Sequence, residues 1–383
     1  MFDNVVDAVT YIEAKRTKRT FLDFKRLIKK YNFKTNLKNV IHIAGTNGKG
    51  STTVLMRDLL MKHGYKVGTF TSPYIINHNE RISVNGQSIS DQKLLQIIND
   101  LYEMIEKENL SMFEIDVCIM LTYFNELDLD YHIIECGIGG LTDKTNVIDS
   151  QVAVITNIGY DHQFMLGNTL LEIAKHKAGI IKAHKVLFTT ENDQEILTLF
   201  KNTCQSKNSD LYVIDVPVQE SYPYHIVFKN HEYILKQASY QVNNLMLALY
   251  VIDYMIDLNV DVIQDVIDDF FWPCRFEKAG DIYLDGAHNI NGIQALLKTL
   301  NEQQIDDVGI VFSALNDKDV TEMLELLNDY DIILASFDDD RSCQNNINFQ
   351  DAITLMKEKH ENVVVTGSLH FVSAVRKYVL SAS

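Results

Sequence analysis

The sequence predicts an α/β protein with a large domain built on a mostly parallel sheet and a smaller, Rossmann-like α/β domain at the C-terminal end. Three observations predict this fold class. Short apolar runs alternate with segments of helical period, which is typical of βαβ units. The alternation occurs in two series, with Trp272 and Pro273 between them. The 383 residues also exceed what one hydrophobic core usually supports. We therefore expect domains over residues 1–272 and 278–383, joined by a hinge at 273–277.

The expected strands fall into two groups. The first group covers residues 40–43, 66–70, 131–134 and 152–158, and a glycine, serine, asparagine or aspartate lies just beyond each run. The second group covers residues 282–284, 309–313, 332–335 and 363–366. Helical patterns fill the segments between strands, so we expect parallel sheets covered by helices on both faces.

Composition and charge limit the classes of function. With 46% hydrophobic and 23% charged residues and 4 prolines, the chain is that of an ordinary folded protein rather than a disordered or fibrous one. Its 35 Lys and Arg against 52 Asp and Glu give a formal charge of −17, which disfavours nucleic acid and anionic membranes as partners. The cysteines are scattered and no apolar run reaches the length of a membrane span, so we expect a cytoplasmic protein. A monomer is the simplest expectation.

A glycine-rich loop follows the first expected strand. Gly45-Thr46-Asn47-Gly48-Lys49-Gly50-Ser51-Thr52 lies between the run 40–43 and a helical pattern. Bare backbone N–H groups, the start of a helix and a lysine are together what phosphate binding requires. The spacing departs from G-x-x-x-x-G-K-[ST], because Gly50 separates Lys49 from Ser51. We predict a P-loop-type nucleotide site; the alternative is a glycine turn with an exposed lysine. The residues predicted to contact the nucleotide here are Thr46, Asn47, Gly48, Lys49, Gly50 and Ser51.

Polar side chains stand just beyond three further expected strands: Ser72, Glu135 and His162, the last beside Asp161. Because the carboxyl ends of parallel strands share one edge of a sheet, we expect these side chains to converge near the bound phosphates. Hydroxyl, carboxylate and phosphate oxygens suit Mg²⁺, and histidine is a less usual ligand. The sequence thus predicts a magnesium site of Ser51, Ser72, Glu135 and His162. The plainer alternatives are a turn at Ser72 and a satisfied core pair of His162 with Asp161.

A lysine falls on the apolar face of a predicted helix. Thr169 and Glu172 form a capping-box pattern that opens a helix expected to run through Lys182. Lys177 shares the apolar stripe of this helix by its i, i+3, i+4 spacing. A bare ammonium is costly there, so we expect Lys177 to snorkel to solvent, to pair with an acid or to be chemically altered.

The loop 45–51 resembles the phosphate loop of folylpolyglutamate synthases and dihydrofolate synthases, which belong with the Mur enzymes to a group of ATP-dependent amide ligases. The resemblance extends from about residue 40 to residue 319. It implies that Asn244, Arg275, Asp285 and His288 contact ATP and that D-K-D at 317–319 is a structural turn. It also implies that Lys177, in H-K-A-G where the family has E-K-A-G, is carbamylated and supports the magnesium ion.

The same resemblance implies an acceptor site and a reaction. Phe113 and Glu114 match a motif that lines the pteridine pocket, and Asp143 falls in the segment that corresponds to G-G-R-L-D-A-T-N. The implied enzyme uses ATP and Mg²⁺ to join L-glutamate to the carboxylate of a folate, of dihydropteroate or of both, through an acyl phosphate. Its implied catalytic residues are Lys49, Glu135, His162 and Lys177.

Several positions depart from the family pattern, and they cluster around the acceptor more than around ATP. Leu141 stands in place of arginine, Tyr74 of histidine, Cys274 of glycine and Ile290 of proline. Two alternatives therefore stay open: a ligase of the same chemistry for a non-folate carboxylate, and a catalytically silent nucleotide- or folate-binding paralogue. A dinucleotide-binding oxidoreductase is a weaker third, since G-I-G-G at 137–140 lacks the third glycine of that motif.

Overall fold

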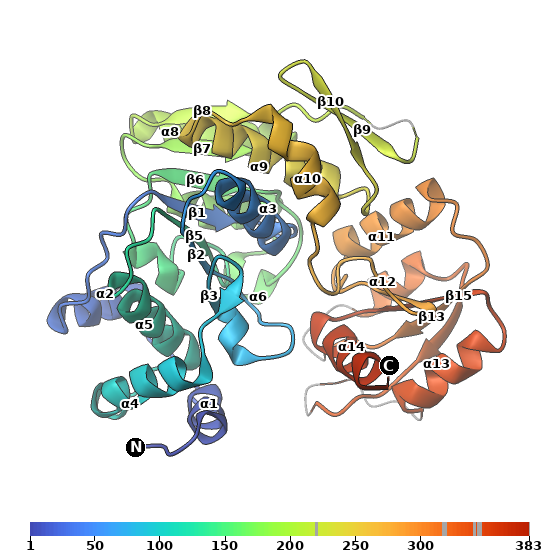
Figure 1. Cartoon of the computed structure of the whole chain (residues 1–383), viewed down its shortest axis with the longest axis horizontal. Helices are drawn as coiled ribbons and strands as arrows, with labels where there is room; N and C mark the ends of the chain where they lie inside the picture. Colours follow the sequence, from blue (N-terminus) through green and yellow to red (C-terminus); the bar gives the residue numbers. More distant parts are fainter. Residues whose placement is uncertain (219–220, 316–319, 340–341, 343–346, 383) are drawn as a thin grey trace. The chain divides into compact units, whose positions relative to one another are not determined.

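The structure is a computed structural model that describes residues 1–383 except 219–220, 316–319, 340–341, 343–346 and 383. The chain divides into two compact units, each visible in Figure 1. The N-terminal unit comprises Met1–Val216 and Asn243–Val266, and the C-terminal unit comprises Pro217–Val242 and Ile267–Ser383. Residues 217–242 thus pack with the C-terminal half, which the sequence ranges did not anticipate. The hinge at 273–277 stays a prediction, and the turn at 317–319 lies outside the described residues.

The N-terminal unit is built on an eight-stranded sheet of order β4-β3-β2-β5-β1-β6-β7-β8. Six of its strands are parallel: β1 (Val40–Ala44), β2 (Val67–Phe70), β5 (Tyr131–Glu135), β6 (Val152–Ile155), β7 (Val186–Thr189) and β8 (Asp210–Val213). Two antiparallel strands, β3 (Ile82–Val84) and β4 (Gln87–Ser88), extend one edge. Every residue of β1, β2 and β5 is buried, as expected for central strands covered on both faces. The predicted mostly parallel sheet is confirmed.

Helices cover this sheet through two hydrophobic clusters. One cluster joins α1 (Val5–Glu13), α2 (Phe21–Lys30), α4 (Asp91–Glu108) and α5 (Met112–Asn125) to the β2–β5 side of the sheet. The other joins α7 (Leu170–Lys177) and α8 (Gln194–Ser206) to β6 and β7. The remaining helices are α3 (Lys49–Lys62), α6 (Gln163–Leu166), α9 (Gln241–Met255) and α10 (Ile263–Asp269), with 3₁₀ turns at His78–Arg81, Lys144–Val147, Ala178–Ile180 and Val260–Val262.

The prediction of a helix that runs through Lys182 is wrong in its length. The helix ends at Lys177 and tightens into the 3₁₀ turn Ala178–Ile180. The cause is a second segment that takes the last carbonyl groups, because Leu141 N donates to His176 O at 2.7 Å and Asn146 Nδ2 donates to Gly179 O at 3.2 Å. This segment packs so closely that a Cβ on Gly179 would lie 2.3 Å from Leu141 Cα.

The C-terminal unit contains a five-stranded sheet of order β11-β12-β15-β13-β14. Its strands are β11 (Glu277–Ala279), β12 (Ile282–Leu284), β13 (Val308–Phe312), β14 (Asp331–Leu334) and β15 (Asn362–Thr366), of which only β11 pairs antiparallel. Its helices are α11 (Ile290–Glu302), α12 (Val320–Leu326), α13 (Phe349–Lys357) and α14 (Leu369–Ala382). The smaller α/β fold is confirmed, with β11 and the separate hairpin β9 (Tyr224–Phe228) and β10 (His231–Leu235) as additions.

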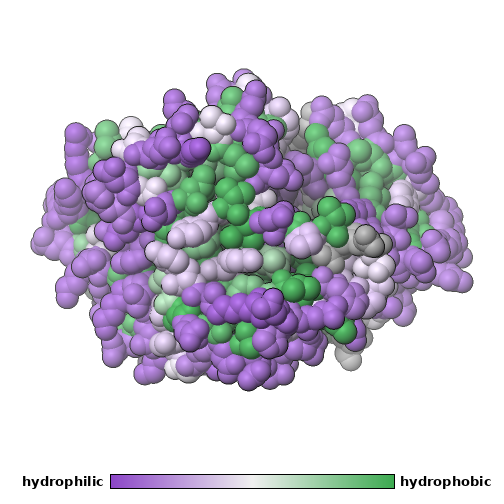
Figure 2. Space-filling model, turned by 90° about the horizontal axis from the view of Figure 1, so that it is seen from above, coloured by the Kyte–Doolittle hydropathy of each residue, from purple (hydrophilic) through white to green (hydrophobic). Residues whose placement is uncertain are grey.

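The surface agrees with the acidic composition. The face seen in Figure 2 is mainly hydrophilic, and apolar residues form smaller areas between the polar ones. Over the described part of the chain, no helix combines the length and the apolar character needed to cross a membrane.

Candidate active site

The glycine-rich loop joins β1 to α3, as predicted, and brings Asn244 against itself. Gly48 caps α3 with a φ of +84°, a left-handed conformation that favours glycine. A Cβ on Gly48 would lie 2.3 Å from Asn244 Oδ1, so this position also requires the small residue for space. Thr52 Oγ1 donates to the same Asn244 oxygen at 3.4 Å. The sequence did not predict how closely α9 approaches the loop.

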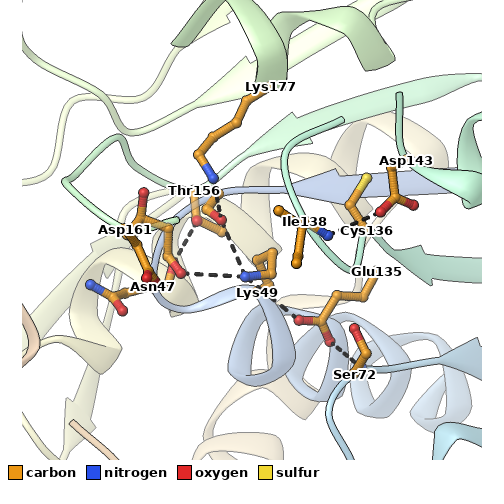
Figure 3. A network of polar contacts seen from close by, with 12 residues as sticks. Asn47, Lys49, Ser72, Glu135, Cys136, Ile138, Asp143, Thr156, Asp161 and Lys177 are labelled. Atoms are coloured by element: carbon orange, nitrogen blue, oxygen red, sulfur yellow. Dashed lines mark hydrogen bonds and ion pairs between the residues drawn. The ribbon is translucent and has the colours of Figure 1, made fainter. Parts of the chain in front are cut away.

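Two lysines point into the loop from opposite sides (Figure 3). Lys49 Nζ donates to Gly45 O at 3.1 Å and to Thr46 O at 3.3 Å, and Lys177 Nζ donates to Gly45 O at 2.8 Å. Lys177 is only 4% exposed, so it does not snorkel to solvent. Burial, reinforced by the Lys49 ammonium, lowers the pKa of Lys177 to about 7. Its amine is therefore partly neutral at neutral pH.

A buried carboxylate lies on the other side of Lys49. Glu135 ends β5, is 3% exposed, and places Oε1 3.9 Å from Lys49 Nζ. Its Oε2 accepts a hydrogen bond from Ser72 N at 3.2 Å, so the structure brings Glu135, Ser72 and Lys49 together (Figure 3). The convergence expected at the carboxyl ends of neighbouring strands is realised for these three residues.

His162 stands at the start of α6 in a left-handed conformation with a φ of +51°. Its Nε2 lies 3.7 Å from Asp161 Oδ2, but the side chain is 35% exposed. A fully buried core pair is therefore the wrong alternative for this histidine.

The donor chemistry fits magnesium. Within the described residues, no three His, Cys, Asp or Glu side chains gather into a metal cluster. A cation at Glu135 would thus depend mainly on hydroxyl groups, phosphates and water, which is how Mg²⁺ is usually bound. Ser51 lies in the first turn of α3 and Ser72 follows β2, so both hydroxyls belong to segments that reach this edge of the sheet.

A buried polar chain lies behind Glu135 and joins the predicted Asp143 to His42, Thr145 and Cys136, which the sequence did not single out. His42 Nε2 is 2.8 Å from Thr145 Oγ1 and 3.1 Å from Cys136 Sγ. Asp143 accepts hydrogen bonds from Ile138 N at 3.0 Å and Thr145 N at 2.9 Å, and burial raises its pKa. Burial, followed by the Lys182 ammonium, lowers the pKa of His42 to about 3, so His42 is neutral. The histidine in the otherwise apolar run 40–43 was the available signal.

Glu114 does not present a free carboxylate. It is completely buried at the first turn of α5, where Oε2 accepts a hydrogen bond from Ser111 N at 3.0 Å. Its Oε1 lies 3.1 Å from Lys144 Nζ and 3.5 Å from Arg19 Nε. Lys144, which the sequence analysis did not single out, also stands 5.5 Å from the centroid of the Phe24 ring.

Phe113 faces the sheet edge from the same turn of α5. Its ring centroid lies 5.9 Å from that of Phe70. A Cβ on Gly137 would come within 2.7 Å of the Phe113 ring, so the glycine directly after Cys136 makes room for it.

The predicted nucleotide residues of the C-terminal unit gather around Gly286. Asp285 is buried and accepts hydrogen bonds from Tyr240 Oη at 2.7 Å and Ala287 N at 2.9 Å. A Cβ on Gly286 would lie 2.5 Å from Arg275 Nη1, and His288 Nδ1 is 2.9 Å from Gly286 O. Burial raises the pKa of Asp285 against the opposing effects of Arg275 and Tyr240.

Cys274, which departs from the family pattern, lies in a backbone conformation that favours glycine. The family pattern has glycine there, and Cys274 still adopts a left-handed φ of +58°. Its carbonyl accepts a hydrogen bond from Gly286 N at 2.8 Å. The backbone turn is thus formed with a side chain that is rarely found in this conformation.

Comparison with known proteins gives a consistent set of relatives. The family model of the Mur ligase middle domain matches residues 43–252. A dihydrofolate synthase/folylpolyglutamate synthase of Bacillus subtilis (strain 168) is 34% identical and covers 88% of this chain and 89% of its own length.

Two solved structures match the whole chain. A bifunctional folylpolyglutamate synthase/dihydrofolate synthase with Mn, AMPPNP and L-glutamate bound has a TM-score of 0.84 at 25% identity, covering 99% of this chain and 98% of that one. A folylpolyglutamate synthase complex with AMPPCP and folate has a TM-score of 0.85 at 27% identity, covering 98% and 100%. The chain therefore belongs to the dihydrofolate synthase/folylpolyglutamate synthase family and is an ATP-dependent ligase of the Mur type.

Proposed function

We propose that this enzyme joins L-glutamate to the carboxylate of a folate, of dihydropteroate or of both, and converts ATP to ADP and phosphate. The substrate carboxylate attacks the γ-phosphorus and releases ADP, and the amine of glutamate then attacks the acyl phosphate and releases phosphate. The arrangement of Lys49 and Lys177 around the Gly45 carbonyl, with Glu135 held beside Ser72, is the observation that carries the proposal. The relatives bound to AMPPNP, L-glutamate and folate support it.

The phosphate loop would bind ATP through its backbone amides and Lys49. Gly48, Gly50 and Ser51 bring their N–H groups to the start of α3, where the helix dipole favours an anion. Thr46 and Asn47, whose N–H groups donate to Asn157 O and Asn157 Oδ1 at 3.0 Å, would border the nucleotide beside them. Lys49 would neutralise the transferred phosphoryl group, and Asn244 would fix the loop through its contact at Gly48.

The metal would be held by Ser51, Ser72, Glu135 and His162. When bound, Mg²⁺ supplies neutralisation of phosphate charge and orientation of the phosphates. Glu135 would offer the metal a buried carboxylate, with Oε1 3.9 Å from Lys49 Nζ and Oε2 accepting a hydrogen bond from Ser72 N.

Lys177 would act as a carbamate. A neutral amine attacks CO₂, the N–C bond forms and a proton leaves, which converts a cation into an anion. The pKa of about 7 supports this step, since an ordinary lysine is almost wholly protonated at neutral pH. The resulting anion would stand beside the loop and support the metal.

The acceptor would bind near Phe113 and Asp143. Phe113 offers an aromatic face to a pterin ring, and Asp143 holds the 137–145 turn that borders it. Glu114, which the resemblance places in the same pocket, would act through Lys144, whose ammonium it orients at 3.1 Å. Arg275, Asp285 and His288 would contact the nucleotide from the C-terminal unit.

A second candidate is the same ligase chemistry on a non-folate carboxylate. Leu141 is 46% exposed at a position where the family has arginine, and the nearby cation is Lys144 instead. Under either candidate we place the protein in the cytoplasm as a monomer. We also propose that it binds neither nucleic acid nor membranes, which the formal charge of −17 supports.

The test is ADP release by purified protein with ATP, Mg²⁺ and L-glutamate, given dihydropteroate, tetrahydrofolate or no acceptor in parallel. Acceptor-dependent ADP release that Lys49→Ala abolishes is the expected result, and the active acceptor identifies the step that the enzyme serves. No stimulation by either pterin, in a protein that still binds ATP, would direct the search to other carboxylates.

A further inference from the structure

A buried histidine that no step of the proposed reaction uses, His78, lies within the segment that joins β2 to β3, here called the 71–81 loop. His78 Nδ1 is 2.9 Å from Glu13 Oε1 at the end of α1, and its Nε2 is 2.8 Å from Asp116 Oδ1 on α5. Both His78 and Asp116 are buried. The imidazole thus connects the loop to two helices at once.

The charges of this cluster balance only with a protonated histidine. Arg81 Nε lies 3.6 Å from Asp116 Oδ2, so two cations face the carboxylates of Asp116 and Glu13. Burial alone would lower the pKa of His78, but Asp116 and Glu13 outweigh it and raise the pKa to about 9. Tyr74 completes the packing, with its ring 5.6 Å from that of His78 and a hydrogen bond to Glu13.

Hydrogen bonds within the 71–81 loop hold its parts together, so fixing the position of His78 also restricts the position of Ser72. Thr71 N donates to Arg81 O at 2.9 Å, which closes the loop at its two ends. The Glu80 carboxylate accepts hydrogen bonds from Ile75 N at 2.8 Å and Asn77 N at 3.0 Å. The same loop carries Ser72, whose N–H donates to Glu135.

We propose that His78 is a positioning residue for the metal site: by bridging Glu13 and Asp116, it fixes the 71–81 loop so that Ser72 stands against Glu135. The inference rests on the proposed function, which places Ser72 and Glu135 at the metal. His78 touches neither the metal nor a substrate and acts through the loop alone. Loss of its charge leaves Asp116 with Arg81 as its remaining cation, and the loop loses the contact of His78 with α1 while it keeps the hydrogen bond of Tyr74 to Glu13.

The test is the affinity of the full chain for Mn²⁺ in the presence of AMPPNP, measured by electron paramagnetic resonance. We compare the wild type, His78→Gln and the control His225→Gln, which removes an exposed histidine 2.7 Å from Glu232 on the β9–β10 hairpin. His78→Gln should raise the Kd for Mn²⁺ by about 10- to 100-fold, the usual effect of losing a partner that orients metal ligands. His225→Gln should leave it unchanged, and metal-free AMPPNP binding should be the same in all three.

Hydrogen exchange gives a second readout that does not involve the metal. The amides of Ser72, Ile75 and Asn77 should exchange faster in His78→Gln than in the wild type, because the position of the loop sustains the bonds that protect them. Ile75 N and Asn77 N donate to Glu80 within the loop, and Ser72 N donates to Glu135 on β5. Unchanged Mn²⁺ affinity and unchanged exchange in a folded His78→Gln protein would overturn the proposal.

Glu13→Gln decides the matter if His78→Gln does not fold. The Glu13 side chain is 32% exposed, so its charge can be removed with less disturbance, and weaker Mn²⁺ binding is again expected. Unchanged binding overturns the role of the bridge. The assay contains no acceptor, so failure of the folate assignment does not affect it, whereas a wild type that binds no Mn²⁺ overturns the metal site and this role together.

Discussion

Lys49 and Lys177 donate to the same carbonyl oxygen, that of Gly45, at 3.1 and 2.8 Å. Two ammonium groups that share one acceptor repel each other, and the repulsion is strong where water is excluded. The Glu135 carboxylate, 3.9 Å away, partly compensates the positive charge of Lys49, while Lys177 is the more deeply buried of the two lysines. The pair therefore favours the neutral form of Lys177.

Replacing Lys177 with alanine should lower kcat by about 100-fold or more, because a charged group is lost beside the phosphates. Lys175→Ala on the same helix is the matched control, since Lys175 is exposed, and it should retain activity. Short carboxylates such as formate or acetate should restore part of the activity of Lys177→Ala. A ¹³C-bicarbonate NMR experiment should show a carbamate signal in the wild type that the variant lacks.

Protonation of Lys177 should lower the activity of the enzyme at acid pH. With a pKa of about 7, Lys177 gains a proton as the pH falls below 7, and a protonated amine cannot hold a carbamate. Activity should therefore fall on the acid side of pH 7 and recover with added bicarbonate. Full activity of Lys177→Ala, or an acid limb that bicarbonate does not move, would contradict the carbamate.

His42 should make the N-terminal unit less stable in acid. Its folded pKa of about 3 lies below the ordinary value of 6.5, so the unfolded chain binds a proton that the folded chain refuses. This contribution is complete above pH 6.5 and is lost as the pH falls towards 3, by at most about 1.4 kcal/mol per pH unit. Urea denaturation at several pH values should show a shallower pH dependence in His42→Gln, and an unchanged one in the exposed-histidine variant His231→Gln.

The core of the fold could be predicted because its strands are both short and apolar. The runs that became β1, β5 and β12 were found within one residue, since every residue of β1 and β5 is buried and the pattern is continuous. The β9–β10 hairpin was missed, because β9 alternates buried and exposed residues and contains His225 among them. A half-buried strand outside both series carries little signal beyond its alternation.

Only those residues of the site that lie at the ends of strands could be placed together from the sequence. Glu135 and Ser72 were placed together because they follow neighbouring strands, and β2 pairs with β5 in the structure. The His42–Cys136 contact depends on the register of β1 against β5, in which His42 faces Ile134, and a single sequence does not reveal register. The Lys144–Glu114 pair depends on how a 3₁₀ turn packs on α5, which no motif encodes.

Replacing Gly48 with alanine should weaken nucleotide binding, because the added methyl group would meet Asn244 and not only because of the left-handed backbone. Gly48 and Gly64 have nearly the same φ, +84° and +83°, but a Cβ meets Asn244 at 2.3 Å in the first case and nothing within 4 Å in the second. Each variant should lose about 1–2 kcal/mol of unfolding free energy from the left-handed backbone. Only Gly48→Ala should weaken AMPPNP binding by calorimetry, and equal binding by both variants would contradict the contact.

Replacing Lys144 should weaken binding of the acceptor and leave binding of ATP unchanged. Its ammonium meets Glu114 at 3.1 Å and Arg19 O at 2.7 Å, so Lys144→Met leaves Glu114 with Arg19 at 3.5 Å as its remaining cation. We expect the KM for the acceptor to rise by about 10-fold, the equivalent of roughly 1.4 kcal/mol of binding, with the KM for ATP unchanged. Lys93→Met, which removes a lysine paired with Glu126 on the surface of α4, is the control and should change neither constant.

The second variant of this series places a cation back where the family has one. Leu141→Arg in the Lys144→Met background should lower the KM of a pterin acceptor if the folate assignment holds, because the two positions lie on the same 137–145 turn. If the rise in KM is confined to ATP, Lys144 acts on the nucleotide and the acceptor pocket lies elsewhere. If Leu141→Arg instead abolishes turnover of the best acceptor, the exposed leucine is part of a pocket shaped for a different carboxylate, and the second candidate function is favoured.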